Sequence, residues 1–234
     1  MAERLTIDVS ERERVTALAY RAPDDRRVGV TVVVAHGAGA GQSSGFMVRF
    51  ATGLASRGLD VLTFNFLYTE QQRRVPDRTE KLEACYRAAI AVACSYSAFD
   101  RNALFIGGKS MGGRIASHLA AQETDSEAKG LVLLGYPLHP PGKPDQLRAA
   151  HLGNIRVPML FIQGSRDPFG TPAELRPVLD RLAAPVTLHV VENGDHSLAP
   201  PRGSALALDE IHGQVQDTIV KWIATISPSP SYGR

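Results

Sequence analysis

A serine stands between glycines at the point where an apolar run gives way to a helical pattern. Ser110 is the centre of Gly108-Lys-Ser-Met-Gly112, which has the form G-x-S-x-G. In this pattern a sharp strand-to-helix turn exposes the serine hydroxyl as a nucleophile. Gly108 and Gly112 are the elbow glycines, because strand and helix cross too closely there for a Cβ. The motif predicts acyl-transfer chemistry, most simply hydrolysis.

Two nucleotide-binding motifs resemble parts of this sequence and are rejected. Gly108-Lys-Ser110 also ends a phosphate-binding P-loop, but that motif needs glycine at position 103, where Ala103 opens an apolar, strand-like run. The cluster Gly37–Gly41 misses G-x-G-x-x-G, because Gln42 and Ser44 occupy the positions of the third glycine. We therefore expect no nucleotide cofactor.

A serine nucleophile needs a base to accept its proton. Three histidines follow Asp167, the acid candidate described next, as the order serine, acid, histidine requires. His189 falls within a predicted strand and His212 within the predicted closing helix. His196 follows a strand in Gly194-Asp-His, which favours it as the base over a solvated turn residue.

An acid must orient that base, and Asp167 is the best placed. It lies just past a predicted strand, in Gly164-Ser-Arg-Asp, whereas Asp145 precedes that strand and Asp180 falls in a helix. Asp195, beside the histidine, fits a turn residue better than the acid. The predicted catalytic residues are Ser110, Asp167 and His196.

The tetrahedral intermediate of acyl transfer needs two backbone N–H donors. One is predicted at Met111, directly after the nucleophile, and the other at Ala38, in a loop after an earlier strand. Gly37 or Gly39 could replace Ala38 in this role, and a plain flexible loop is the alternative interpretation. His36 is expected to support the loop by hydrogen bonding.

Short apolar runs alternate with helical patterns along the chain, which predicts an α/β fold with a mainly parallel central sheet of about seven or eight strands and helices on both faces. Reactive residues follow the strands, at the edge where such sheets bind ligands. The predicted strands are Leu5–Val9, Val15–Tyr20, Val28–Ala35, Leu59–Phe64, Ala103–Ile106, Leu131–Gly135, Val157–Gln163 and Val186–Val191. The predicted helices begin near Phe46, at Asp77 or Thr79 as N-cap, at Met111, at Pro172 and near Leu208.

The organisation predicts one domain over residues 1–226 and a flexible Ser/Pro-rich tail over residues 227–234. Only Tyr136–Arg156 separates two consecutive strands where a cap could be inserted, with room for one short helix near Asp145–Leu152. No cap domain is therefore expected, and the site should be shallow and accessible.

The composition is that of an ordinary globular protein: 234 residues, 44% hydrophobic and 21% charged, with a net charge of +2. This charge gives no reason to expect nucleic acid or a membrane as partner, and the polar start with no long apolar stretch predicts a cytoplasmic location. Cys85 and Cys94 lie on opposite sides of a predicted helix, so they should be unpaired, and both are predicted to be buried. No metal-ligand spacing is present, so no metal is expected. Monomer and homodimer both remain open.

Residues after the strands are candidates for binding a small-molecule acyl substrate. Phe66 and Tyr68 could line an acyl site or pack beneath the loop, and Tyr136 follows another strand, as do His36 and Gly37. Lys109, with Arg73 and Arg74, could favour an anionic group, although loop charges are usually solvated.

Taken together, His36-Gly-Ala-Gly, Gly108-Lys-Ser-Met-Gly-Gly, Gly164-Ser-Arg-Asp and Gly194-Asp-His resemble the small, lidless, dienelactone-hydrolase-like α/β-hydrolases. The branch with testis-expressed protein 30 and the hydrolase-like subunit 3 of the NSL complex is the most similar, including at Asn65–Glu70 and Gly135–Gly142. The resemblance covers nearly the whole chain. It implies the α/β-hydrolase fold and the three catalytic residues but no substrate, and some relatives serve as scaffolds.

The sequence thus predicts a serine hydrolase acting on a carboxylic ester, thioester or lactone. An acyltransferase would use the same residues. A catalytically silent interaction module is the alternative of a different class, but such a module has no physical need for a strained serine elbow.

Overall fold

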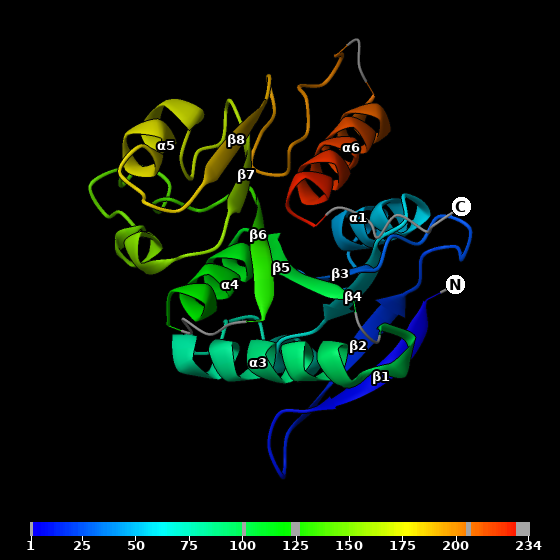
Figure 1. Cartoon of the computed structure of the whole chain (residues 1–234). Coiled ribbons are helices and arrows are strands. Elements are labelled where there is room, and N and C mark those ends of the chain that lie inside the picture. Colours follow the sequence, from blue (N-terminus) through cyan, green and yellow to red (C-terminus); the bar gives the residue numbers. More distant parts are fainter. Residues whose placement is uncertain (1, 100–101, 123–126, 205–206, 228–234) are drawn as a thin grey trace.

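The computed structural model describes residues 2–99, 102–122, 127–204 and 207–227. Its centre is one eight-stranded sheet in the order β1-β2-β4-β3-β5-β6-β7-β8 (Figure 1). The first two strands pair antiparallel, β2 also pairs antiparallel with β4, and the other pairs are parallel. The strands are β1 Glu3–Asp8, β2 Arg14–Tyr20, β3 Val30–Ala35, β4 Asp60–Phe64, β5 Ala103–Lys109, β6 Ala128–Leu134, β7 Met159–Gly164 and β8 Val186–Val191.

Helices cover both faces of this sheet, which confirms the predicted fold class. On one side α1 (Gly45–Ser56) and α6 (Leu208–Ile226) pack on β-branched strand residues. On the other side lie α3 (Thr79–Ser95), α4 (Met111–Gln122) and α5 (Pro172–Leu179) (Figure 1). The interior strands β3, β4 and β7 are buried at every position, because helices exclude water from both of their faces.

Two features of the segments that connect the strands differ from the sequence prediction. The α3 helix has Arg78 as its N-cap, not Asp77 or Thr79, and no side chain caps it. The connection between β6 and β7 carries only the 3₁₀ helix η2 (Ala150–Asn154), later than the predicted helix near Asp145–Leu152. Prolines and glycines before position 150 keep that segment irregular. No cap domain is inserted there.

Three further details were not predicted or were wrong. A single helical turn, α2 (Leu67–Glu70), follows β4, and a 3₁₀ turn, η1 (Ser97–Phe99), follows α3. Cys85 is buried, but Cys94 is exposed and its thiol contacts the Glu127 carboxylate at 3.1 Å. Because the two thiols lie on opposite sides of an amphipathic helix, burying one leaves the other in solvent. The predicted flexible tail lies outside the described residues except for Ser227.

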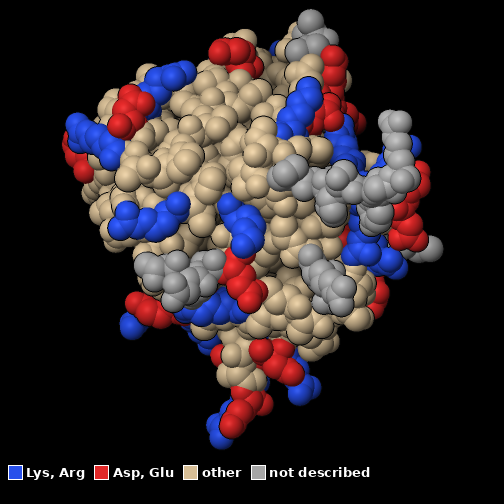
Figure 2. Space-filling view, viewed as in Figure 1, with Lys and Arg blue, Asp and Glu red and all other residues tan. Residues whose placement is uncertain are grey.

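The surface carries charges of both signs. On the face drawn in Figure 2, basic and acidic side chains are interspersed, as expected for a chain whose net charge is +2. Among the helices that the structure describes, none is long and apolar enough to cross a membrane.

Candidate active site

The serine elbow connects β5 to α4. Ser110 has a left-handed backbone with φ of 51°, and its N–H donates to the Leu134 carbonyl at 2.9 Å. A Cβ placed on Gly108 or on Gly112 would come within 2.4 Å of the Ala35 carbonyl oxygen on the neighbouring strand β3. Only glycine fits at both positions, as predicted, and the strained turn therefore presents the hydroxyl above the sheet edge.

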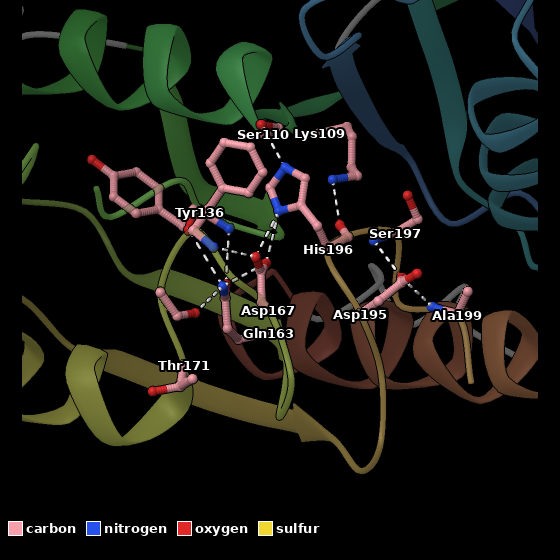
Figure 3. A network of polar contacts seen from close by, with 12 residues as sticks. Lys109, Ser110, Tyr136, Gln163, Asp167, Thr171, Asp195, His196, Ser197 and Ala199 are labelled. Atoms are coloured by element: carbon pink, nitrogen blue, oxygen red, sulfur yellow. Dashed lines mark hydrogen bonds and ion pairs between the residues drawn. The ribbon is translucent and has the colours of Figure 1, made fainter. Parts of the chain in front are cut away.

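Ser110, His196 and Asp167 form one continuous chain of hydrogen bonds (Figure 3). The Ser110 Oγ lies 2.9 Å from His196 Nε2, and His196 Nδ1 lies 2.8 and 3.0 Å from the two Asp167 oxygens. A carboxylate only accepts hydrogen bonds, so Nδ1 carries the proton and Nε2 presents its lone pair to the serine. The structure thus brings together the three residues predicted from three separate loops.

The Asp167 carboxylate is fully buried and is held by two further donors. The Gln163 amide donates to Oδ2 at 2.9 Å, and the Phe169 backbone N–H donates to Oδ1 at 2.9 Å. Gln163 in turn accepts from the Tyr136 N–H at 2.8 Å (Figure 3). A buried charge requires such partners, and these bonds fix the orientation of the carboxylate toward His196. The helix that follows is capped by Thr171, so Asp167 is free for this contact.

The histidine loop reaches the acid loop through a close backbone approach at Gly164. A Cβ there would lie 2.4 Å from the carbonyl oxygens of Gly194 and Asp195. The Asp195 side chain accepts from the N–H groups of Ser197 and Ala199, which confirms it as a turn residue. The turn therefore has its own internal acceptor, and the imidazole next to it is left for Asp167.

Two side chains pack around His196 itself. The Phe169 ring stacks on the imidazole, with ring centroids 4.1 Å apart and planes inclined by 29°. Lys109, only 8% exposed, donates from Nζ to the His196 carbonyl. Burial lowers the pKa of Lys109 to about 8, although Asp167 and Asp195 act in the opposite direction.

The loop after β3 is held by His36, which is fully buried. Its Nε2 accepts from the Phe66 N–H at 3.1 Å, so its proton is on Nδ1, 2.9 Å from the Gly37 carbonyl. Burial lowers the pKa of His36 to about 4, which keeps the ring neutral near pH 7. The predicted supporting role of His36 is thus met by its contacts, and Ala38 lies exposed in the loop that it supports.

A cavity of about 550 Å³ opens above Ser110 and His196. Among the residues proposed for the oxyanion hole or for substrate binding, Ala38, Met111, Gly37 and Lys109 line it. The remaining lining residues are Ala40, Ser44, Phe46, Met47, Pro76, Asp77, Arg78, Thr79, Leu82, Arg114, Pro137, Arg148, Phe169 and Ser197.

Four of the candidate substrate-binding residues do not line this cavity: His36, Phe66, Tyr68 and Tyr136. All four are buried. Phe66 packs edge-on against the His36 ring at 5.0 Å, so packing beneath the loop was the correct alternative for this aromatic residue. Tyr136 donates from Oη to the Arg148 carbonyl at 2.7 Å and so supports a neighbouring segment. An aromatic side chain removes more apolar surface from water when it packs in the core than when it lines a hydrated site.

Sequence reasoning missed several residues that surround the site. For Gln163 the sequence did contain a signal of a role in the site, since it is a polar residue at the end of an otherwise apolar buried strand. Phe169, Arg114 and Arg148 had none, because their position depends on how the loops pack. In the part of the chain that the structure describes, no three His, Cys, Asp or Glu side chains are grouped as metal ligands.

Comparison with solved structures gives the same fold. A dienelactone hydrolase from Anabaena variabilis matches 97% of this chain and 98% of its own at 19% identity, with a TM-score of 0.76. A serine hydrolase without lid from Xanthomonas campestris covers 94% of both chains at 18% identity and a TM-score of 0.71. An α/β serine hydrolase homologue from Coxiella burnetii covers 95% and 97%, at 18% identity and a TM-score of 0.73.

At such low identities these likenesses establish the lidless fold alone. The sequence itself also matches a family model described as an alpha/beta hydrolase domain, over residues 28–224. That match takes in every strand from β3 onward, the serine elbow, the acid loop and the histidine loop. The family model also supports hydrolase activity in general terms. Because it matches most of the chain, this protein belongs to the α/β-hydrolase family.

Proposed function

We propose that the protein is a serine hydrolase that cleaves a carboxylic ester through an acyl-enzyme intermediate. Ser110 is the nucleophile, His196 the general base and acid, and Asp167 the residue that orients the imidazole. The observation that carries this proposal is the hydrogen-bonded chain of these three side chains, two of which, Ser110 and His196, line an open cavity. Within the small α/β-hydrolases, we place the protein in the branch that includes testis-expressed protein 30.

In the first half of the reaction, Ser110 Oγ attacks the ester carbonyl carbon while His196 Nε2 takes the hydroxyl proton. The resulting oxyanion is stabilised by the N–H groups of Met111 and Ala38, aided by the N-terminal dipole of α4. The intermediate collapses when the bond to the alcohol oxygen breaks. His196 then gives its proton to that oxygen, and the alcohol leaves.

In the second half, water replaces the alcohol. His196 accepts a proton from the water, whose oxygen attacks the acyl carbon and breaks the bond to Ser110 Oγ. The proton returns to Ser110, and the carboxylic acid is released. Buried and hydrogen-bonded, Asp167 stabilises the imidazolium that forms in both halves, and it keeps its negative charge throughout.

Covalent labelling with a fluorophosphonate tests this mechanism. The wild type should be labelled at Ser110, and the label should be located by mass spectrometry of the digested protein. Labelling should fall sharply in His196→Ala, where no base remains, and less in Asp167→Asn, where the imidazole loses only its orienting partner.

Turnover of activated esters supplies the second readout. Ser110→Ala should lower kcat/KM by about 10⁴-fold or more. Equal and slow reaction of wild type and Ser110→Ala with every probe and ester would instead favour a catalytically silent interaction module.

A further inference from the structure

Basic side chains predominate around the cavity. Four cationic residues line it, Lys109, Arg78, Arg114 and Arg148, against the single lining carboxylate of Asp77 among the residues described. The Asp77 carboxylate already accepts from Arg73, at 2.6 Å. Because Lys109 donates to the His196 carbonyl, the arginines are the cations left to face the cavity.

Arg114 and Arg148 stand out because they are partly buried, whereas Arg78 is exposed, and because their guanidinium groups have no hydrogen-bond or ion-pair partner within the described chain. Structural arginines elsewhere do have one: Arg27 pairs with Asp60 and Arg57 with Asp217, each at 2.6 Å. Burial lowers the pKa of Arg114, and the charge of Arg148 lowers it further. Two like charges kept close together in a partly buried place favour an anion between them.

Both arginines extend from a fixed backbone. Arg114 lies one helical turn after the nucleophile, and its N–H donates to the Ser110 carbonyl at 3.0 Å. Around Arg148, the backbone N–H donates to the Leu138 carbonyl at 2.7 Å, and the Arg148 carbonyl accepts from Tyr136. The backbone beneath both side chains is thus fixed, and both residues line the cavity that also contains Ser110, so an anion held by them would lie near the reacting ester.

We propose that Arg114 and Arg148 together bind a carboxylate carried by the substrate, so that the preferred substrate is an anionic ester. The inference rests on the proposed hydrolase function and specifies its substrate class. A planar guanidinium matches a carboxylate with two parallel hydrogen bonds, and such charge-assisted bonds are the strong ones. Arg73 and Arg74, the loop arginines that the sequence suggested for this role, do not line the cavity.

Matched ester pairs test the proposal. One pair carries the charge on the acyl side: 4-nitrophenyl hydrogen adipate and its neutral 4-nitrophenyl methyl adipate. The other carries it on the alcohol side: 4-carboxyphenyl butyrate and 4-carbamoylphenyl butyrate. The readout is how the ratio of kcat/KM for the charged and neutral members changes between wild type and each variant, because intrinsic reactivity then cancels.

The variants Arg114→Gln and Arg148→Gln each remove one guanidinium without breaking an intramolecular ion pair. In at least one pair, each should lower kcat/KM for the charged ester about tenfold to hundredfold and leave the neutral ester within about twofold. Arg148→Lys should lower kcat/KM for the charged ester by less than Arg148→Gln does, since lysine keeps the positive charge but cannot donate two parallel hydrogen bonds. Arg181→Gln, an exposed charge loss outside the cavity lining, is the matched control. Equal effects on charged and neutral esters in either cavity variant would overturn the proposal.

Binding without turnover separates this proposal from the hydrolase function. Calorimetry of adipate with Ser110→Ala should show binding that weakens at least tenfold when Arg148→Gln or Arg114→Gln is added. Undiminished binding in either double variant would overturn the anion site even if the enzyme cleaves esters. Ser110-dependent cleavage of neutral esters alone would leave the hydrolase standing and remove the substrate class.

Discussion

Lys109 and His196 are joined by a hydrogen bond from the lysine Nζ to the histidine backbone carbonyl. The residue that precedes the nucleophile in the chain therefore holds the loop that carries the proposed base. Lys109 also lies over the Phe46 ring, with Nζ 5.7 Å from its centroid. A lysine this deeply buried is stabilised by such contacts, and they connect the elbow to the histidine loop independently of the catalytic side chains.

Replacing Lys109 should leave His196 in the protein but hold its position less firmly. Lys109→Met keeps much of the buried volume but leaves the His196 carbonyl without its partner. We expect kcat/KM for an activated ester to fall about tenfold to hundredfold, mainly through kcat, because a charge-assisted bond is lost. Lys129→Met, at an exposed position on β6, is the control and should behave like wild type. Unchanged kcat in Lys109→Met would show that the bond does not position His196.

His36 should make stability depend on pH on the acid side. Its pKa is about 4 in the fold and 6.5 when unperturbed, so the unfolded chain binds more protons between these values. Stability from this group is fully present above pH 6.5 and is lost as the pH falls toward 4. Relative to His36→Gln, whose amide is neutral at every pH, the wild type should lose on the order of 2 kcal/mol of unfolding free energy by pH 4. Urea unfolding from pH 7.5 to 4 measures this difference. An unfolding free energy that changes with pH by the same amount in the wild type and in His36→Gln would contradict the prediction.

Gln163 should matter for both stability and activity. Gln163→Leu leaves buried Asp167 without one donor and the Tyr136 N–H without its acceptor. An unfolding free energy lower by roughly 3 kcal/mol is expected, with a reduced kcat, because the carboxylate is less well oriented. Gln214→Leu, an exposed change on α6, supplies the comparison. A variant as stable and active as this control would show that Gln163 only fills space.

The elbow glycines should tolerate no side chain. In Gly108→Ala and Gly112→Ala the new methyl group would lie 2.4 Å from the Ala35 carbonyl, which forces β5 and α4 away from β3. We expect unfolding free energy to fall by about 3 kcal/mol or more, or soluble protein to be lost. Gly45→Ala, where a Cβ meets nothing within 4 Å, should be neutral or slightly stabilising in chemical denaturation. Equal stability of the three variants would refute the steric argument.

Predictions from the sequence were correct where the pattern and its physical cause both lie within a few neighbouring residues. Apolar runs predicted all eight strands, with ends displaced by at most three residues, and the glycine spacing located the turn at Ser110. Errors arose where a local preference competed with packing. Asp77 is a good N-cap by type, yet its carboxylate binds Arg73 and the helix starts at Thr79 with Arg78 as the cap.

The candidate site likewise contains residues that could be assigned from the sequence and residues that could not. Ser110, Asp167 and His196 could be selected from one sequence because each follows a strand, and parallel strands bring their carboxyl ends to one edge. Aromatic residues after strands could not be assigned, since Phe66 and Tyr68 can satisfy an apolar preference equally well in the core or at a cavity.

By itself, then, the sequence determined the order of strands and helices, the strained elbow and the three residue types that meet at the sheet edge. Periodicity and glycine geometry act over a few residues and need no knowledge of distant contacts. Only the tertiary structure decided that Gln163 binds Asp167, that Lys109 holds His196, and that Arg114 and Arg148 share one cavity. These relationships join residues from separate loops, and their distances follow from how the sheet and helices pack, which no local pattern contains.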